Sequence, residues 1–169
     1  SAREIASTAA AISSRSSLRA VSSTFVWSAA SADSNSVWSI GKSGVTAIDV
    51  GYGHACAVLE DTTVRCWGDN EFGQLGDGTT DDRSTPVEVA GLTGVRAIAT
   101  AAGGQHTCAL LIDTTVTCWG MDIIATLAGG SGNVLVLSPT AVSGLVGVSG
   151  IGAGSMFTCA AITTGAVRC

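Results

Sequence analysis

The alternation of apolar and polar segments is clearest between residues 54 and 68. Two short apolar or β-branched runs, Val58-Leu59 and Val64-Arg65-Cys66-Trp67, flank the polar segment Glu60–Thr63. β-Branched and aromatic residues favour strands, and a short polar segment between two such runs favours a turn. The pattern therefore predicts a β-hairpin over residues 54–68.

This hairpin pattern occurs three times. Residues 106–120 repeat it closely, and residues 157–169 repeat it up to the second cysteine, without the Trp-Gly pair that ends the first two copies. The first cysteines of the copies are Cys56, Cys108 and Cys159, which are 52 and 51 residues apart. A fixed period of this length is typical of solenoids, arrays and propellers, in which each repeat is one structural unit.

The repeats divide the chain into five segments. Before the first repeat, two apolar runs around Trp27 and Trp38 flank a polar turn and predict a hairpin without cysteines. The first two repeats each continue beyond the hairpin into a long loop and an edge-type strand that contains a proline. We therefore expect a Ser/Ala-rich N-terminal arm (1–22), a degenerate hairpin or partial blade (23–43), two full repeats (44–93 and 94–146) and a partial third repeat (147–169).

The two cysteines of each hairpin lie about symmetrically around its turn, so they can face each other across the strands. Opposed residues at a non-hydrogen-bonded pair have Cα atoms about 4.5 Å apart, within the range of disulfides. Six buried free thiols, or bridges between neighbouring repeats, are the alternatives. The nine residues between paired cysteines do not match the short spacing of a zinc knuckle. The predicted bridges are Cys56–Cys66, Cys108–Cys118 and Cys159–Cys169.

Charge and composition limit the partners and the compartment. The formal net charge of −5 argues against a nucleic-acid partner. Charged residues make up 12% of the chain, which is low and indicates a surface covered by partner proteins or by glycans. The Ser/Thr-rich N-terminal region offers sites for O-linked glycans. Paired cysteines indicate a secreted, extracellular or cell-surface protein, and no apolar run is long enough for a transmembrane helix.

The repeated residues resemble a known family. The shared features are His-x-Cys-Ala-x-Leu, a turn, Val-x-Cys-Trp-Gly, the loop Asn70-Glu-Phe-Gly-Gln-Leu-Gly76 and a following Ser/Thr-Pro strand. Together they resemble the regulator of chromosome condensation repeats in their bacterial, cysteine-paired form, over about residues 44–169. The resemblance implies an all-β fold of propeller blades, with one four-stranded blade for each full repeat. Two full repeats plus partial ones would form an incomplete propeller.

The resemblance also implies that the repeated side chains are structural. The residue at the position of the two repeat histidines is Phe157 in the third copy. A site that accepts phenylalanine does not require acid–base chemistry, so we expect these histidines to pack or hydrogen-bond locally. The expected structural residues are His54, Trp67, Gly68, Gly73, Gly76, His106, Trp119 and Gly120.

No arrangement of residues predicts catalysis, a metal site or a cofactor site. The main acidic cluster comprises Asp69, Glu71, Asp77, Asp81 and Asp82, and its spacing does not fit an EF-hand loop. We expect it to be a solvated loop. No Ser/His/Asp or Cys/His set stands apart from the repeats, so the chain is not expected to be an enzyme.

The predicted function is a non-enzymatic binding or structural module. Too few repeats are present to close a ring, and an open ring leaves strand edges unpaired. The chain is therefore expected to be a fragment of a larger closed propeller, or a self-assembling, filament-forming subunit whose partners are further copies of itself. In the second case the arm of residues 1–22 would add to a sheet edge of a neighbouring copy. The resemblance extends to propeller-type β-lactamase inhibitors, which gives the alternative function of an enzyme inhibitor.

Overall fold

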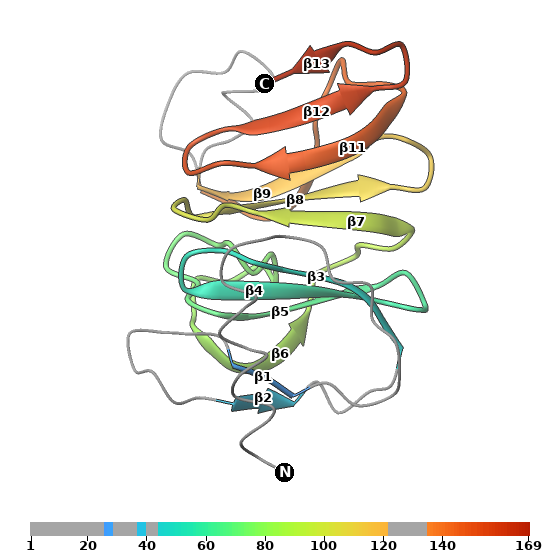
Figure 1. Cartoon of the computed structure of the whole chain (residues 1–169). Helices are drawn as coiled ribbons and strands as arrows, with labels where there is room; N and C mark the ends of the chain where they lie inside the picture. Colours follow the sequence, from blue (N-terminus) through green and yellow to red (C-terminus); the bar gives the residue numbers. More distant parts are fainter. Residues whose placement is uncertain (1–25, 29–36, 40–43, 122–134) are drawn as a thin grey trace.

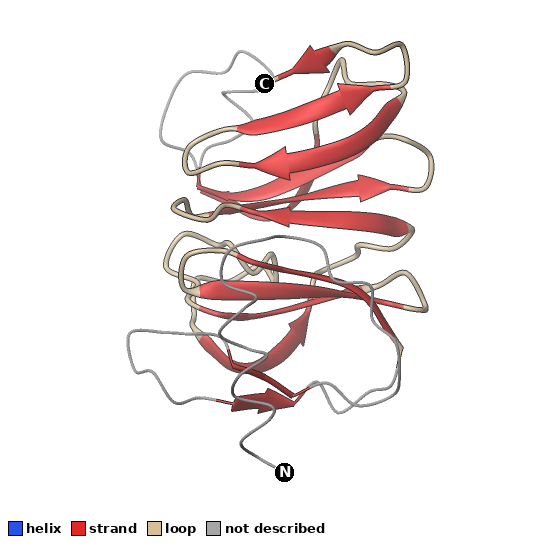
Figure 2. Ribbon diagram, viewed as in Figure 1, coloured by secondary structure: helices blue, strands red, loops and turns tan. Residues whose placement is uncertain are grey.

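The computed structural model describes residues 26–28, 37–39, 44–121 and 135–169. Every regular element within these ranges is a β-strand, as Figure 2 shows. The strands form four antiparallel sheets, of which two have four strands, one has three and one has two. The prediction of an all-β chain is confirmed.

The two full repeats each form one four-stranded sheet, with the strands in chain order. In both sheets neighbouring strands pair antiparallel; short turns join the first three strands, and a longer segment leads to the fourth. The first sheet comprises β3 (Val45–Val50), β4 (His54–Leu59), β5 (Val64–Gly68) and β6 (Arg83–Glu88). The second sheet comprises β7 (Val95–Thr100), β8 (His106–Leu111), β9 (Val116–Met121) and β10 (Leu135–Ala141).

Two smaller sheets lie at the ends of the stack in Figure 1. The third sheet contains β11 (Val148–Ala153), β12 (Thr158–Ile162) and β13 (Val167–Arg168). At the other end, β1 (Val26–Ser28) pairs with β2 (Val37–Ser39), and β2 contacts β6. The hairpin without cysteines, which the sequence predicts around Trp27 and Trp38, is thus present with these two residues opposite each other.

Consecutive sheets pack face to face through their first two strands. Strand β7 contacts β3 and β4 of the preceding sheet, and β11 contacts β7 and β8. The first strands of the three larger sheets therefore lie side by side along the stack, and the fourth strands β6 and β10 lie at the outer edges. This is the arrangement of blades in a propeller, and the three sheets form an incomplete one.

Alternation along the second strand of each sheet gives it two faces. In β4, His54, Cys56 and Val58 point to one face, and Ala55 and Ala57 point to the other. We name the first the back face, because it packs against the next sheet along the chain, and the second the front face. The same positions in the later repeats define the back and front faces of the second and third sheets.

Three hydrophobic clusters form the described core, and two of them lie at the boundaries between consecutive sheets. One cluster joins the back of the first sheet to Ala109 and Trp119 on the front of the second. A second cluster joins the back of the second sheet to Ala160 on the front of the third. A third cluster covers the front of the first sheet, and all its members come from that sheet. Stacking thus buries the back face of each sheet that has a successor among the described strands.

The three predicted disulfides form inside their hairpins. Cys56 lies opposite Cys66 and Cys108 opposite Cys118 in the register of the strands. The Cα atoms of each bonded pair are 4.0 to 4.1 Å apart, and the pairs are Cys56–Cys66, Cys108–Cys118 and Cys159–Cys169. A cross-link over such a short loop stabilises the fold by roughly 2–3 kcal/mol in the chain-entropy model. The first two bonds lie on back faces and are fully buried.

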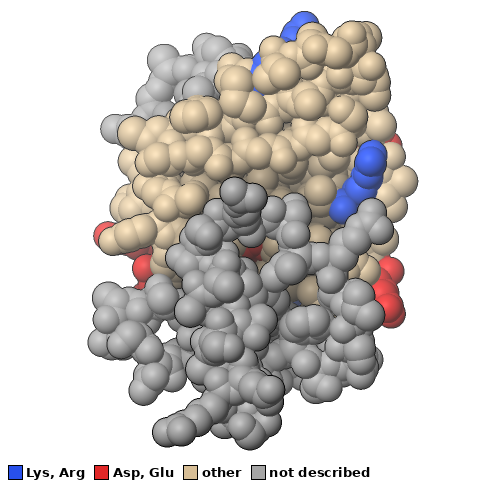
Figure 3. Space-filling model, in the orientation of Figure 1, with Lys and Arg blue, Asp and Glu red and all other residues tan. Residues whose placement is uncertain are grey.

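Charged side chains are sparse on the described surface. In the view of Figure 3 the described atoms are mostly uncharged, with isolated basic and acidic groups. Within the described ranges no helix has the length and apolar character needed to cross a membrane.

Candidate protein-binding surfaces

A histidine joins each full repeat to the sheet that follows. The His54 Nε2 atom is 2.9 Å from Thr107 Oγ1, and both side chains are buried. The second repeat reproduces this contact, with His106 Nε2 at 2.9 Å from Thr158 Oγ1. The sequence predicted local packing or hydrogen bonding for these histidines. The structure adds a contact between sheets through the Nε2 atom of each histidine, while His54 Nδ1 also lies 3.5 Å from the main-chain oxygen of Tyr52 in its own repeat.

The direction of the first of these hydrogen bonds follows from a third residue. The Thr107 hydroxyl donates to the main-chain oxygen of Gln74 at 2.9 Å. A hydroxyl has a single proton, so Thr107 must accept the hydrogen bond from His54 Nε2–H. Burial lowers the pKa of His54 to about 4, and it lowers the pKa of His106 to about 4 as well. Both imidazoles are therefore neutral at neutral pH.

The main-chain oxygen of Gln74 also accepts a hydrogen bond from the Trp119 indole. Trp119 Nε1 donates to it at 2.9 Å, so a loop of the first repeat binds two side chains on the front of the second sheet. Gly76 lies beside this contact with φ +69, and a Cβ atom there would be 2.7 Å from Trp119 Nε1. Both the backbone conformation and the lack of space require glycine at this position. Gly73 makes a similar close approach to Leu137 of β10.

The Trp-Gly pairs lie near the end of the third strand of each full repeat. Trp67 and Trp119 are buried on front faces. Gly68 and Gly120 follow them in the left-handed region, where a Cβ atom would clash with the main chain at Gly53 and Gln105 respectively. These expected structural residues therefore all lie at points of close backbone approach or in a sheet boundary.

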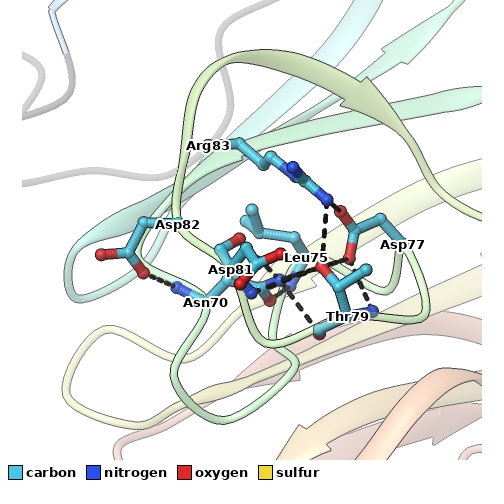
Figure 4. Close-up of polar contacts among 7 residues, drawn as sticks. All are labelled: Asn70, Leu75, Asp77, Thr79, Asp81, Asp82 and Arg83. Carbon is cyan, nitrogen blue, oxygen red and sulfur yellow. Dashed lines mark hydrogen bonds and ion pairs between the residues drawn. The ribbon is translucent and has the colours of Figure 1, made fainter.

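The loop after β5 is closed by its own polar groups (Figure 4). The buried Asn70 side chain donates to the main-chain oxygens of Thr79 and Asp81, and its Oδ1 atom accepts from Leu75 N at 3.0 Å. The Arg83 Nε atom donates to Asp77 Oδ2 at 2.8 Å. These contacts fix the loop that carries Gln74 and Gly76.

The acidic cluster is only partly the solvated loop that the sequence predicted. The Asp77 side chain is 8% exposed and forms an ion pair with Arg83. Partial burial pushes the pKa of Asp77 upward, but hydrogen bonds from Thr79 and Arg83 outweigh it and hold that pKa below its usual value. For Asp69, burial and then the charges of Asp82 and Glu71 raise the pKa. Within the described part of the chain no group of three His, Cys, Asp or Glu residues is placed to hold a metal ion.

The back face of the third sheet is exposed, unlike the back faces of the first two sheets. Val167 is 66% exposed, whereas Val64 and Val116 at the same repeat position are 0% and 1% exposed. Phe157 is 50% exposed, whereas the histidines at its position are buried. A hollow lined by Ser143, Gly144, Leu145, Val167, Arg168 and Cys169 runs beside β13. We call the back face formed by Phe157, Cys159, Ala161, Val167 and Cys169 the open back face.

This chain is similar in sequence to known proteins that contain the same kind of repeat. Residues 63–110 match the family model described as Regulator of chromosome condensation (RCC1) repeat, and residues 45–74 match a second model of the same description. The ultraviolet-B receptor UVR8 of Arabidopsis thaliana is 37% identical over 76 residues, which are 45% of this chain and 17% of the receptor. The E3 ubiquitin-protein ligase HERC2 of Mus musculus is 32% identical over 130 residues, 75% of this chain and 2% of the ligase. The matches thus span less than a fifth of these relatives.

Solved structures share the fold. The yeast RCC1 protein (Prp20), in a crystal structure with Kap60, superposes with a TM-score of 0.64 at 23% identity, over 78% of this chain and 33% of that chain. Human WBSCR16 superposes with a TM-score of 0.64 at 24% identity, over 73% of this chain and 32% of that chain. At these identities the likeness supports the fold, and the aligned part is about a third of each structure.

Proposed function

Because the chain contains regulator of chromosome condensation repeats folded as propeller blades, we propose that it is a non-enzymatic protein-binding module. The observation that carries the proposal is the stack of blade-like sheets with a sparsely charged described surface, because the cores of protein interfaces are depleted in charged residues.

The repeated polar side chains support a binding role over a catalytic one. His54 and His106 form hydrogen bonds between sheets, and Asn70 and Asp77 close a loop. These groups are already engaged in holding the fold. The ligase activity in the name of HERC2 does not transfer, because the match covers 2% of that protein.

We further propose that the module is extracellular or attached to the cell surface. All six cysteines form disulfides inside hairpins, and disulfides persist mainly in oxidising compartments. The test is to alkylate thiols in freshly lysed producing cells and in the medium, before any oxidation. Fully alkylated cysteines in the cell-associated, cytosolic fraction, with no protein outside, would contradict this location.

The partner we propose is a further copy of the chain, so that the module self-assembles. A sparsely charged surface is suited to being covered by neighbours, and O-linked glycans on the N-terminal region would solvate what stays exposed. The arm of residues 1–22 is proposed to add to the sheet edge of a neighbouring copy.

Multi-angle light scattering tests the assembly directly. We expect the oxidised full chain to have a mass above that of a single copy and to gain mass with concentration. A variant lacking residues 1–22 should assemble less if the arm bridges copies. A chain that stays monomeric up to millimolar concentration would refute self-assembly.

A further inference from the structure

The front face of the first sheet is buried, although no described cluster joins it to another sheet. Ala55, Ala57 and Trp67 on this face are 0–1% exposed. The front faces of the second and third sheets are buried by the preceding sheet, whose residues join them in the two boundary clusters. The cluster at the front of the first sheet contains residues of that sheet only. Another part of the chain therefore covers this face.

The described hairpin before the first repeat lies on this side of the stack. Strand β2 contacts β6, and in Figure 1 the pair β1 and β2 lies beyond the first sheet, on the side away from the second sheet. Strand β6 is the outer edge of the first sheet, whereas Ala55 and Trp67 lie on the two central strands. The contact with β6 thus brings the chain that precedes the repeats to the edge of the buried face.

Four parts of the chain lie outside the described residues, and the ends of each limit what it can cover. Residues 29–36 close the hairpin, and residues 40–43 join it to the first sheet. Residues 122–134 connect β9 to β10, so both of their ends are held in the second sheet. Residues 1–25 are the longest of the four parts and lead into the hairpin beside the first sheet. They are the part best able to lie across the front face.

We propose that the arm of residues 1–22 covers the front face of the first sheet in its own chain and acts as a cap. The terminal units of repeat proteins need such a cap, because their apolar face would otherwise meet water. In one respect the inference rests on the proposed function. The arm must leave this face before it can add to the sheet edge of a neighbouring copy, so its release would be the first step of self-assembly.

The composition of the arm suits this face. Two of the side chains that form the face are alanines, and small side chains leave little relief except beside the Trp67 indole. Six of the first 22 residues are alanine, and small residues allow a close approach of the arm to such a surface. The larger apolar side chains of the arm are Ile5, Ile12, Leu18 and Val21. Their burial against the face would provide the favourable free energy of the contact.

The Trp67 indole indicates a polar group that the cap must supply. Among the described residues no hydrogen-bond acceptor reaches its Nε1–H group, although the side chain is fully buried. At the same repeat position Trp119 donates to the main-chain oxygen of Gln74, in a loop of the preceding repeat. Buried polar groups normally have a partner. A main-chain oxygen of the arm is expected to take the place of the Gln74 oxygen.

Charge at apolar positions of the arm tests the cap in the full-length chain. The variant Ile5→Asp/Ile12→Asp should be oxidised by hydroxyl radicals at Trp67 at least about tenfold faster than the wild-type chain, because carboxylates do not stay in an apolar contact. Mass spectrometry of the peptides measures each tryptophan separately. Trp119 is the internal control, since the first sheet covers it, and its rate of oxidation should stay unchanged.

A matched variant and a second measurement separate the cap from a general effect of charge. Ser13→Asp/Ser16→Asp adds the same two carboxylates at polar positions of the arm and should leave Trp67 protected. Photoreactive benzoylphenylalanine in place of Ile12 tests proximity without added charge. After activation in the single-copy fraction from size exclusion, it should form cross-links to residues of the first sheet.

The outcomes distinguish the cap from self-assembly. If Trp67 stays protected in Ile5→Asp/Ile12→Asp, or if the cross-links reach only other sheets, the cap is wrong and self-assembly is unaffected. If Trp67 becomes reactive but the wild-type chain does not assemble at any concentration, the cap stands and self-assembly is wrong. In a wild-type chain that assembles, Trp67 should react faster in the assembled fraction than in the single-copy fraction. Equal rates would show that assembly does not require release of the arm.

Discussion

Replacing His54 by phenylalanine should make the protein less stable at neutral pH and more stable in acid. The third repeat has Phe157 at this position, so the hairpin itself accepts phenylalanine, but Phe157 is 50% exposed whereas His54 is buried. At pH 7.5 the variant loses the hydrogen bond from His54 Nε2 to Thr107, a cost of about 1 kcal/mol. The Thr107 hydroxyl keeps its acceptor, the Gln74 oxygen, so no buried donor is left unpaired.

The acid effect follows from the pKa of the histidine. Burial lowers the pKa of His54 from 6.5 to about 4 in the folded chain. Between these values the unfolded chain binds more protons than the folded one, so the stability from a neutral His54 is present above pH 6.5 and is lost as the pH falls towards 4. By pH 4 the loss is about 3 kcal/mol, which the phenylalanine variant avoids. The variant should therefore be more stable by about 2 kcal/mol at pH 4.

Urea unfolding followed by tryptophan fluorescence measures both values, because Trp67 and Trp119 are buried in the folded chain. The difference between variant and wild type is the relevant quantity, because His106 and the carboxylates titrate in both proteins. Free energies that run parallel from pH 7.5 to pH 4 would show that His54 is not held neutral by burial. A variant that is more stable at every pH would show that its hydrogen bond to Thr107 contributes nothing.

Three further outcomes are expected. Thr114→Gly should stabilise by about 0.5–1 kcal/mol in urea unfolding, because Thr114 has φ 71 and the third repeat has Gly165 there; a destabilised variant would contradict this. Gly76→Ala should destabilise by at least about 2 kcal/mol, since it combines a left-handed conformation with a side-chain clash, and unchanged stability would refute the geometry. In the native protein, mild reductant and alkylation should modify Cys159 and Cys169 first, because Cys169 is exposed and the other two bonds are buried; mass spectrometry that finds another bond opened first would oppose this.

The sequence predicted the hairpins well because each is a local feature. The two strands of residues 54–68, the turn between them and the Cys56–Cys66 bridge lie within fifteen residues. The repetition of the same residues two further times made the period visible. The alternation of apolar and polar residues and the residues of the turn are sufficient to locate such hairpins in the sequence. The resemblance to a known family supplied the expectation that the repeats form consecutive propeller blades.

The contacts between repeats were not predicted, because they depend on how the sheets stack. His54 and Thr107 are 53 residues apart, and nothing in the local pattern links them. A signal was present, since a threonine follows both His106 and Phe157. It acquires meaning only when the back of one sheet is known to face the front of the next. The acidic loop was misjudged for a similar reason, because Asp77 is buried by Arg83 and by its own loop.

The departures from the repeat show where its internal contacts are not reproduced. Residues that recur, such as His54, Trp119 and Gly76, are used to fold each sheet and to join it to the next. In the described sheets they form the same contacts between one sheet and the next. Ala55 and Phe157 differ from the other copies at the two faces that no described sheet covers. At both positions the hydrogen-bonded His–Thr pair of the internal junctions is lost, so the two residues mark where the rule of those junctions is not followed.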